Sequence, residues 1–321
     1  MSTAATMGVV GLGSMGLGAA LAAVRSGVPT WGFDTRADAG ARLVAAGGQV
    51  AASLADLAQR CDVVVVLVVT AAQTEAVLFG DGGLVTHMRR GGVIVCSATV
   101  DPALPPLWEE RLLAHGLWLV DGPVSGGPKK AAEGAMTMMA AGRPEAFVAT
   151  AGVLDAIAGT VYRLGDRAGI GSTVKMVNQH LAGVHVAAAC EAMALGLRAG
   201  ADPQALYDVI SNSAGASWMF CNRVPHILAG DYTPLSAVNI FVKDLGIVLD
   251  AARALGFPLP LAATAHQLYL ATAASGHGAE DDSAVIKFYA ALAGLQLPAA
   301  GDAAPAGATT ASAPTAGAAA A

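Results

Sequence analysis

A glycine-rich turn near the start of the chain constrains the fold more than any other feature. Met7–Val10 is a short apolar run that predicts a buried strand, and the next six residues read G-x-G-x-x-G before a helical pattern. In such a unit the first glycine permits a tight turn, the second lets a pyrophosphate approach the backbone, and the third lets helix and strand pack closely. Free N–H groups at the helix N-terminus favour the phosphates. We therefore expect the turn to bind a dinucleotide through Gly11, Leu12, Gly13, Ser14, Met15 and Gly16.

A carboxylate follows the second predicted strand, Thr30–Phe33. Asp34 lies 18 residues after Gly16, close to the distance of about 20 residues at which Rossmann units place the acid that binds the ribose. A carboxylate here accepts hydrogen bonds from the adenosine ribose and repels a 2′-phosphate, which favours NAD over NADP. Arg36 leaves NADP open, because an arginine can pair with that phosphate.

Strand-like and helix-like segments alternate through the first half of the chain, which is typical of a doubly wound, mostly parallel sheet. Residues 63–69 are apolar and mostly β-branched, as in a strand buried on both faces. Further strands are expected at 93–96 and 118–121, and helices at 15–26, 74–79 and 105–115, with a short helix capped by Ser53.

The pattern changes after about Leu164, where helical segments follow one another without strands. A proline-free, alanine-rich pattern runs from Ile170 to Ala199. Further helices are expected at 203–212, 218–229, 242–255, 260–273 and 283–293. We predict an α/β Rossmann domain (1–166) joined by the long helix to an all-α C-terminal domain (167–297). Residues 298–321 are rich in Ala, Pro, Thr and Gly without a core pattern, and a disordered tail is expected there.

The composition excludes several classes of function. The chain has 18 basic and 24 acidic residues and a net charge of −6, without the basic stripe typical of nucleic-acid binders. Its four cysteines lie far apart, with no spacing suited to zinc, so we expect no metal site, and reduced thiols in a cytoplasmic protein. No uninterrupted apolar run reaches the 18 or so residues of a membrane span, so we expect no membrane association.

Four motifs occur in order along the chain, and together they resemble the 3-hydroxyisobutyrate dehydrogenase family, also called the β-hydroxyacid dehydrogenases. They are the glycine turn, D-G-P-V-S-G-G at 121–127, G-x-G-x-x-x-K-x-x-N at 169–178 and K-D-L at 243–245. The resemblance extends over about residues 7–292. It implies that the protein is an NAD-dependent dehydrogenase of small hydroxy acids.

The resemblance also implies roles for particular residues. Lys175 would be the general acid/base, since burial and a second cation would lower its pKa enough for it to lose a proton near neutral pH. It shares a helix face with Asn178, three residues on. The substrate carboxylate would be held by Ser125, Gly126 and Gly127, with Asn178 beside it. The cofactor would be contacted by Val68, Val69, Thr99 and Lys243, of which Val68-Val69 replaces the family's usual Leu-Pro.

Within the family, residues 130–137 and 175–185 most resemble the L-threonate dehydrogenases. This implies oxidation of L-threonate at C2 to 2-dehydro-L-erythronate. A tartronate-semialdehyde reductase or a 3-hydroxyisobutyrate dehydrogenase stays open, because a few pocket contacts separate such substrates. An imine reductase and a non-catalytic binding protein of the same fold are disfavoured, since both lack the lysine. The apolar faces of the long helix indicate a homodimer or homotetramer.

Overall fold

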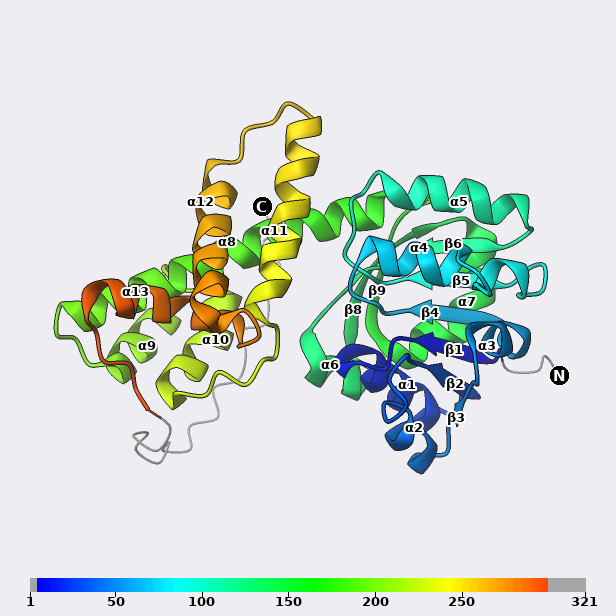
Figure 1. Ribbon diagram of the computed structural model, residues 1–321, viewed down its shortest axis with the longest axis horizontal. Coiled ribbons are helices and arrows are strands. Elements are labelled where there is room, and N and C mark those ends of the chain that lie inside the picture. Colours follow the sequence, from blue (N-terminus) through cyan, green and yellow to red (C-terminus); the bar gives the residue numbers. More distant parts are fainter. Residues whose placement is uncertain (1–4, 300–321) are drawn as a thin grey trace, which may run out of the picture.

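The computed structural model describes residues 5–299 and has two parts joined by one long helix, α8 (Ile170–Arg198). Figure 1 shows the sheet with its covering helices on one side, the helical bundle on the other, and α8 running from one to the other. The prediction of a Rossmann domain followed by an all-α domain is confirmed.

The sheet has nine strands in the order β3-β2-β1-β4-β5-β6-β8-β7, with β9 also paired to β8. The strands are β1 (Met7–Val10), β2 (Thr30–Phe33), β3 (Gln49–Val50), β4 (Val63–Val66), β5 (Val93–Cys96), β6 (Trp118–Asp121), β7 (Val124–Ser125), β8 (Met136–Gly142) and β9 (Ala158–Gly165). Strands β1 to β6 are parallel to one another, whereas β8 runs antiparallel to β6 and β7. The predicted mostly parallel sheet is confirmed.

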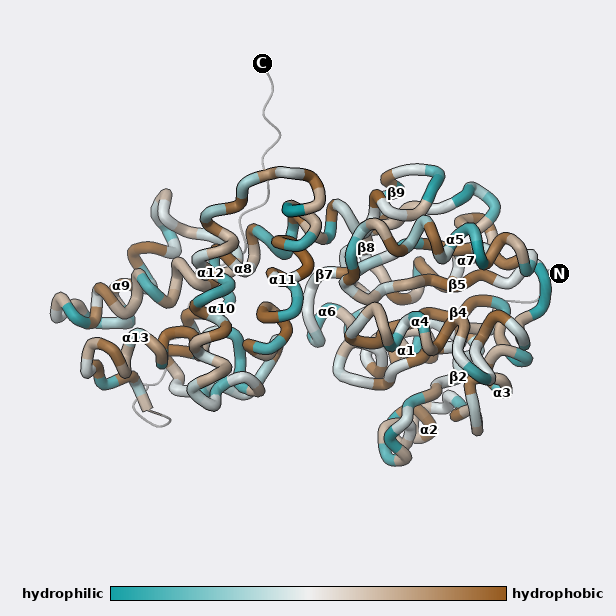
Figure 2. Tube along the Cα trace, turned by 45° about the horizontal axis from the view of Figure 1, so that its top comes forward, coloured by the Kyte–Doolittle hydropathy of each residue, from teal (hydrophilic) through white to brown (hydrophobic). Residues whose placement is uncertain are grey.

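Helices bury both faces of this sheet. Along β4, Val63 and Val65 pack into one apolar cluster with α1 and α7, while Val64 and Val66 pack into another with α3, α4 and α5. These helices are α1 (Ser14–Arg25), α7 (Pro144–Ile157), α3 (Leu54–Arg60), α4 (Ala71–Phe79) and α5 (Leu104–Ala114), and α2 (Ala41–Ala45) and α6 (Gly127–Glu133) are shorter. Figure 2 shows β4 and β5 as hydrophobic segments inside these layers. Burial on both faces explains why the strand sequence does not alternate.

Two of the differences from the prediction in the first half have a physical reason. The strand expected at 63–69 ends at Val66, because the Gln73 side chain accepts hydrogen bonds from the backbone N–H groups of Val69 and Thr70 in a helix cap. The segment 124–165 was not assigned, and it forms two helices and three strands. Its strand β8 reads M-T-M-M-A-A-G, which has few β-branched residues and therefore little of the usual strand signal.

The second part packs helices around α8. They are α9 (Pro203–Ser211), α10 (Trp218–Ala229), α11 (Val238–Ala254), α12 (Pro260–Thr272) and α13 (Val285–Ala293), with short turns at Leu84–Thr86 in the first part and at Ala273–His277 and Asp282–Ala284 here. Helix α11 begins four residues earlier than predicted, at a point where the Val238 N–H donates to the carbonyl of Glu280. The domain limits 1–166 and 167–297 stay predictions, and most of the predicted tail, 300–321, lies outside the described residues.

By length and composition alone, α8 is apolar enough to cross a membrane. The sequence prediction found this helix but considered only uninterrupted apolar runs, and so missed its capacity to pass as a membrane span. The central helix of a globular domain passes the same test, and α8 packs against α10, α11, α12 and α13. Its buried residues include the polar side chains of Ser172, Lys175 and Gln179.

The start of α8 is bound to the carboxyl end of β6. The Asp121 carboxylate, 1% exposed, accepts hydrogen bonds from the N–H groups of Gly169 and Ser172, both at 2.9 Å, and from the Ser172 hydroxyl at 2.6 Å. Burial raises the pKa of this carboxyl, against the effect of these hydrogen bonds. Gly171 lets the helix come this close, since a Cβ there would lie 2.5 Å from the backbone oxygens of Asp121 and Met139.

Gly171→Ala should therefore destabilise the protein, because neither backbone oxygen can rotate away from the new methyl group. We expect the free energy of unfolding in urea to fall by about 1–3 kcal/mol, as for other overpacked sites. Gly152→Ala is the matched control, since a Cβ at that helical glycine of α7 meets no atom within 4 Å. It should stabilise the protein by about 0.5–1 kcal/mol. Equal effects of the two substitutions would contradict this account of the α8 contact.

Candidate active site

The glycine turn has the geometry that a bound pyrophosphate requires. Gly11 has a φ of 91°, and a Cβ there would lie 2.7 Å from the carbonyl oxygen of Leu67. A Cβ on Gly16 would collide with the carbonyl oxygen of Gly11. Around Gly13, in contrast, an added Cβ would meet no atom of the described chain within 4 Å. Gly11 and Gly16 therefore serve packing, and the open space at Gly13 is where a phosphate can approach.

Asp34 is bound to this turn. Its Oδ2 accepts a hydrogen bond from the Leu12 N–H at 2.7 Å, and its Oδ1 accepts from the backbone N–H of Arg36 at 2.9 Å and from the Arg36 Nε at 3.2 Å. Burial raises the pKa of Asp34, but the hydrogen bonds from Arg36 and Leu12 outweigh it, so the net pKa lies below its usual value. Asp34 is thus a carboxylate at neutral pH, held beside the turn.

These residues fit an NAD or NADP molecule. Gly13 and Ser14 are exposed at the N-terminus of α1, where N–H groups face outward and the helix dipole favours phosphate. Leu12 is buried and Met15 half-buried, so both support the turn. Val68 lies beside Gly11, since its nitrogen would be 3.4 Å from a Cβ there, and Val69 follows at the surface. When bound, the nicotinamide supplies the position that accepts or donates a hydride.

Lys175 lies in the second turn of α8 and is 7% exposed. The pKa of its ammonium group is lowered to about 8, mainly by burial; Asp244 opposes this shift and the nearby Lys243 adds to it. No residue of the range 5–299 forms a hydrogen bond or ion pair with this side chain. Lys175 therefore differs from a surface lysine: it is desolvated, unpaired and able to exchange a proton near neutral pH.

Lys243 joins the two parts of the structure. Its Nζ lies 2.6 Å from Asp244 Oδ1 and donates to the carbonyl oxygen of Thr99 at 3.2 Å. Thr99 follows β5 at the carboxyl edge of the sheet, whereas Lys243 belongs to α11. The predicted cofactor contacts Thr99 and Lys243 are thus brought together, and Lys243 is also within electrostatic range of Lys175.

The predicted substrate residues come from two elements. Asn178 is half-buried on α8, one turn after Lys175. Ser125 ends β7, and Gly126 and Gly127 follow it with φ values of 126° and 71°, which only glycine adopts readily. Both views place α6, which begins at Gly127, on the side of the Rossmann domain that faces the helical domain (Figures 1 and 2). Among the described residues, no hydrogen bond joins this segment to Lys175 or Asn178.

Sequence reasoning missed three residues near the site. Asp121 and Asp244 both stand inside motifs that were noticed, but neither received a role. Gln179 lies beside Asn178 and is 8% exposed. The signal that could have found it is a long amide side chain on the buried face of an otherwise apolar helix, since buried amides need partners.

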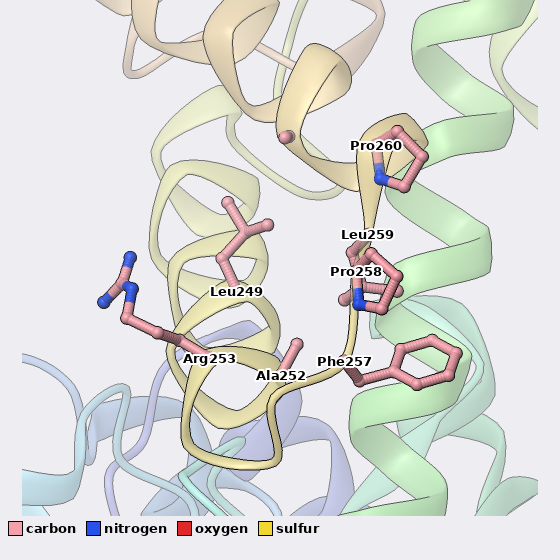
Figure 3. A pocket seen from close by; sticks show the side chains of 8 residues that line it. Leu249, Ala252, Arg253, Phe257, Pro258, Leu259 and Pro260 are labelled. Carbon is pink, nitrogen blue, oxygen red and sulfur yellow. The ribbon is translucent and has the colours of Figure 1, made fainter.

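An apolar pocket elsewhere shares no residue with this site. It lies where α11 turns into α12 and is lined by Leu249, Ala252, Arg253, Phe257, Pro258, Leu259, Pro260 and Ala263 (Figure 3). Among residues 5–299, no group of three His, Cys, Asp or Glu side chains is placed to hold a metal ion.

Known proteins resemble both parts of the chain. The NAD binding domain of 6-phosphogluconate dehydrogenase matches residues 6–165, and a domain described as NAD-binding of NADP-dependent 3-hydroxyisobutyrate dehydrogenase matches residues 169–289. An L-threonate dehydrogenase of Cupriavidus necator is 57% identical over 91% of this chain and 97% of its own length. One of Escherichia coli strain K12 is 51% identical over 91% of this chain and 96% of its own length.

A solved structure agrees with these matches. A 3-hydroxyisobutyrate dehydrogenase from Salmonella typhimurium has a TM-score of 0.84 and 51% sequence identity, and the match covers 88% of this chain and 99% of that one. The chain belongs to the 3-hydroxyisobutyrate dehydrogenase family. As a member of this family it is a hydroxyacid dehydrogenase that binds NAD or NADP.

Gly13→Ala should separate cofactor binding from folding in this family member. A methyl group at Gly13 occupies the space left for the pyrophosphate, so we expect the dissociation constant of NADH, measured by fluorescence, to rise at least tenfold. The free energy of unfolding should change by less than about 1 kcal/mol, since only a cap residue changes. Gly16→Ala, whose Cβ meets a backbone oxygen, should lower the stability instead. Unchanged NADH affinity in folded Gly13→Ala would contradict the assignment.

Proposed function

We propose that this protein oxidises L-threonate at C2 with NAD, giving 2-dehydro-L-erythronate, and that Lys175 is the base. The observation that carries the proposal is the buried, unpaired ammonium of Lys175, whose pKa is about 8, at the junction of the two domains. The substrate class follows from the two relatives named L-threonate dehydrogenase, which are 57% and 51% identical to this chain.

The chain's own residues divide the work of the reaction. Ser125, Gly126 and Gly127 bind the substrate carboxylate, and Asn178 binds a hydroxyl beside it. Lys175 in its neutral form would remove the proton of the C2 hydroxyl and keep it until solvent takes it. A bound nicotinamide would supply the hydride acceptor for the C2 hydrogen, so that the alcohol becomes a ketone. Lys243 keeps its charge compensated by Asp244, so it lowers the pKa of Lys175 without competing as the base.

NAD is the proposed cofactor, with Asp34 as the selecting residue. Its carboxylate is ionised and lies against the glycine turn, where it repels a 2′-phosphate. Arg36 does not offset this repulsion, because its guanidinium is already paired with Asp34.

An assay of dinucleotide reduction across related acids tests the substrate and the cofactor together. The panel contains L-threonate, glycerate and 3-hydroxyisobutyrate, each with NAD and with NADP. The last acid is included because the similar Salmonella structure carries the name 3-hydroxyisobutyrate dehydrogenase. The proposal expects the highest kcat/KM with L-threonate and NAD. A higher value for either other acid would move the assignment to that acid.

We also propose a homo-oligomer in the cytoplasm. Several large apolar side chains of the helical part are exposed, notably Leu255 at 76%, Phe257 at 63% and Leu261 at 66%, and Phe257 also lines the pocket of Figure 3. Exposed apolar surface of this kind is what a second copy would cover. The four cysteines are unpaired, which fits a reducing compartment. The molar mass in solution tests the oligomer.

Replacing Lys175 tests the proposed base. Lys175→Ala should lower kcat with L-threonate by roughly 10²–10⁴-fold, the usual contribution of a general base. Lys175→Arg should be nearly as damaging, because a guanidinium does not give up its proton. Both variants should keep their affinity for NADH, since the dinucleotide lies on the other domain.

Lys287→Ala is the matched control. Lys287 pairs with Glu280 in the helical domain and belongs to none of the predicted binding residues. This variant should keep kcat within about twofold of the unmodified enzyme. A folded Lys175→Ala enzyme with more than about a tenth of the original kcat is incompatible with Lys175 as the base.

A further inference from the structure

A chain of polar side chains connects Asn178 to the opposite domain. Asn178 Nδ2 donates to Gln179 Oε1 at 2.9 Å, and Gln179 Nε2 donates to Asp244 Oδ2 at 2.5 Å. The other oxygen of Asp244 pairs with Lys243, which donates to the carbonyl of Thr99. Gln179 and Asp244 are 8% and 2% exposed. Buried polar groups at this depth are costly unless they are paired, so the chain is maintained as a unit.

Chemistry fixes the direction of these hydrogen bonds. A side-chain amide can turn by 180° with no change in shape, so its partners decide which end points where. The Asp244 carboxylate only accepts, and therefore Gln179 must present its NH₂ group to it. The carbonyl oxygen of Gln179 then faces Asn178, which must present its own NH₂ group. The carbonyl oxygen of Asn178 is left pointing away from Gln179.

We propose that Gln179 is a positioning residue. Its hydrogen bond to Asp244 fixes the orientation of its own amide, and that amide in turn fixes the orientation of the Asn178 amide. Asn178 then offers an acceptor to the substrate, and it selects a ligand with a donor, the hydroxyl group next to the oxidised carbon. The chain would in this way favour a polyhydroxy acid over an analogue without that hydroxyl. This inference rests on the proposed function, because it takes Asn178 as a substrate-binding residue.

The proposed role of Gln179 can be tested by exchanging the amide and the carboxylate between positions 179 and 244. In Gln179→Glu, two carboxylates face each other in a buried space, and their repulsion separates residue 179 from Asp244 and displaces it from its contact with Asn178. In Asp244→Asn, nothing obliges Gln179 to present its NH₂ group, so Asn178 can turn. In the double variant Q179E/D244N, the new Glu accepts from both amides, and Asn178 keeps its direction with the same total charge. A shape-only role for Gln179 does not predict this rescue.

We expect each single variant to raise the KM for L-threonate at least tenfold and to leave the KM for NAD within about threefold. The ratio of kcat/KM for L-threonate to that for 2,4-dihydroxybutanoate, which lacks only the C3 hydroxyl, should fall at least tenfold. The double variant should recover to within about threefold of the unmodified enzyme in both quantities. Gln204→Glu is the control, because Gln204 makes a similar hydrogen bond to Asp208 on the exposed helix α9. It should change neither quantity.

A second readout does not need turnover. In the cofactor-free protein, the side-chain NH₂ signal of Asn178 in ¹H–¹⁵N spectra should move in both single variants and return in the double variant. Thermal unfolding shows whether each variant is folded; where Gln179→Glu fails to fold, Gln179→Met removes the same hydrogen bonds without adding charge.

The outcomes separate the two claims. A double variant no better than the worse single variant, with all variants folded, overturns the inference. If no acid of the panel is oxidised while the Asn178 signal behaves as expected, the proposed function is wrong and the hydrogen-bond chain stands. If L-threonate is oxidised and Gln179→Glu leaves its KM unchanged, the proposed function stands and the inference fails.

Discussion

The contact between Asp121 and the first turn of α8 is the interaction on which the arrangement of the site depends. It places the start of the long helix at the carboxyl edge of the sheet, where parallel strands direct their functional loops. Lys175 follows on the next turn, so its distance from the nicotinamide end is set by how closely this first turn approaches β6. Gly171 makes that approach possible, and three hydrogen bonds to one buried carboxylate make it specific.

A small group of charges at the junction then sets the chemistry. Lys175 is desolvated and unpaired, whereas Lys243 and Asp244 neutralise each other beside it. One contact of this pair reaches Thr99 of the Rossmann domain and another reaches Gln179 of α8. The same residues therefore hold the domains together, shift the pKa of the base in opposite directions and orient an amide beside it. A substitution in this group therefore changes several properties together.

Much of the fold could be predicted because its main elements carry strong local signals. The glycine turn, the valine-only strand β4 and the cap and proline that begin α9 each identify an element without knowledge of its neighbours. The segment from β7 to β9 could not be predicted in this way. Its strands are short or poor in β-branched residues, and they form because β8 pairs with β6 while β7 and β9 pair with β8, which includes a long-range contact. The long apolar helix α8 was found, but its capacity to pass as a membrane span was overlooked.

The same distinction between local signals and long-range contacts applies to the candidate site. Residues in contiguous motifs, such as those of the glycine turn and Lys175, were found because their spacing carries the signal. The roles of Asp121, Gln179 and Asp244 depend on partners more than 45 residues away in the chain, as with Asp121 and Ser172, which are 51 residues apart. Sequence patterns do not reveal such pairs. The predicted contacts of Ser125–Gly127 with substrate also stay predictions, since they depend on a bound acid.

The pH dependence of kcat/KM for L-threonate oxidation tests the central claim most directly, namely that Lys175 accepts the hydroxyl proton as a neutral amine. Burial lowers the pKa of Lys175 to about 8 in the free enzyme, and kcat/KM reports groups of the free enzyme. We predict that kcat/KM rises with pH as Lys175 loses its proton, with a midpoint near pH 8 and a plateau above it. A kcat/KM that stays constant between about pH 6 and pH 9 would contradict this account, because no group with the pKa of Lys175 would then need to be deprotonated for the reaction.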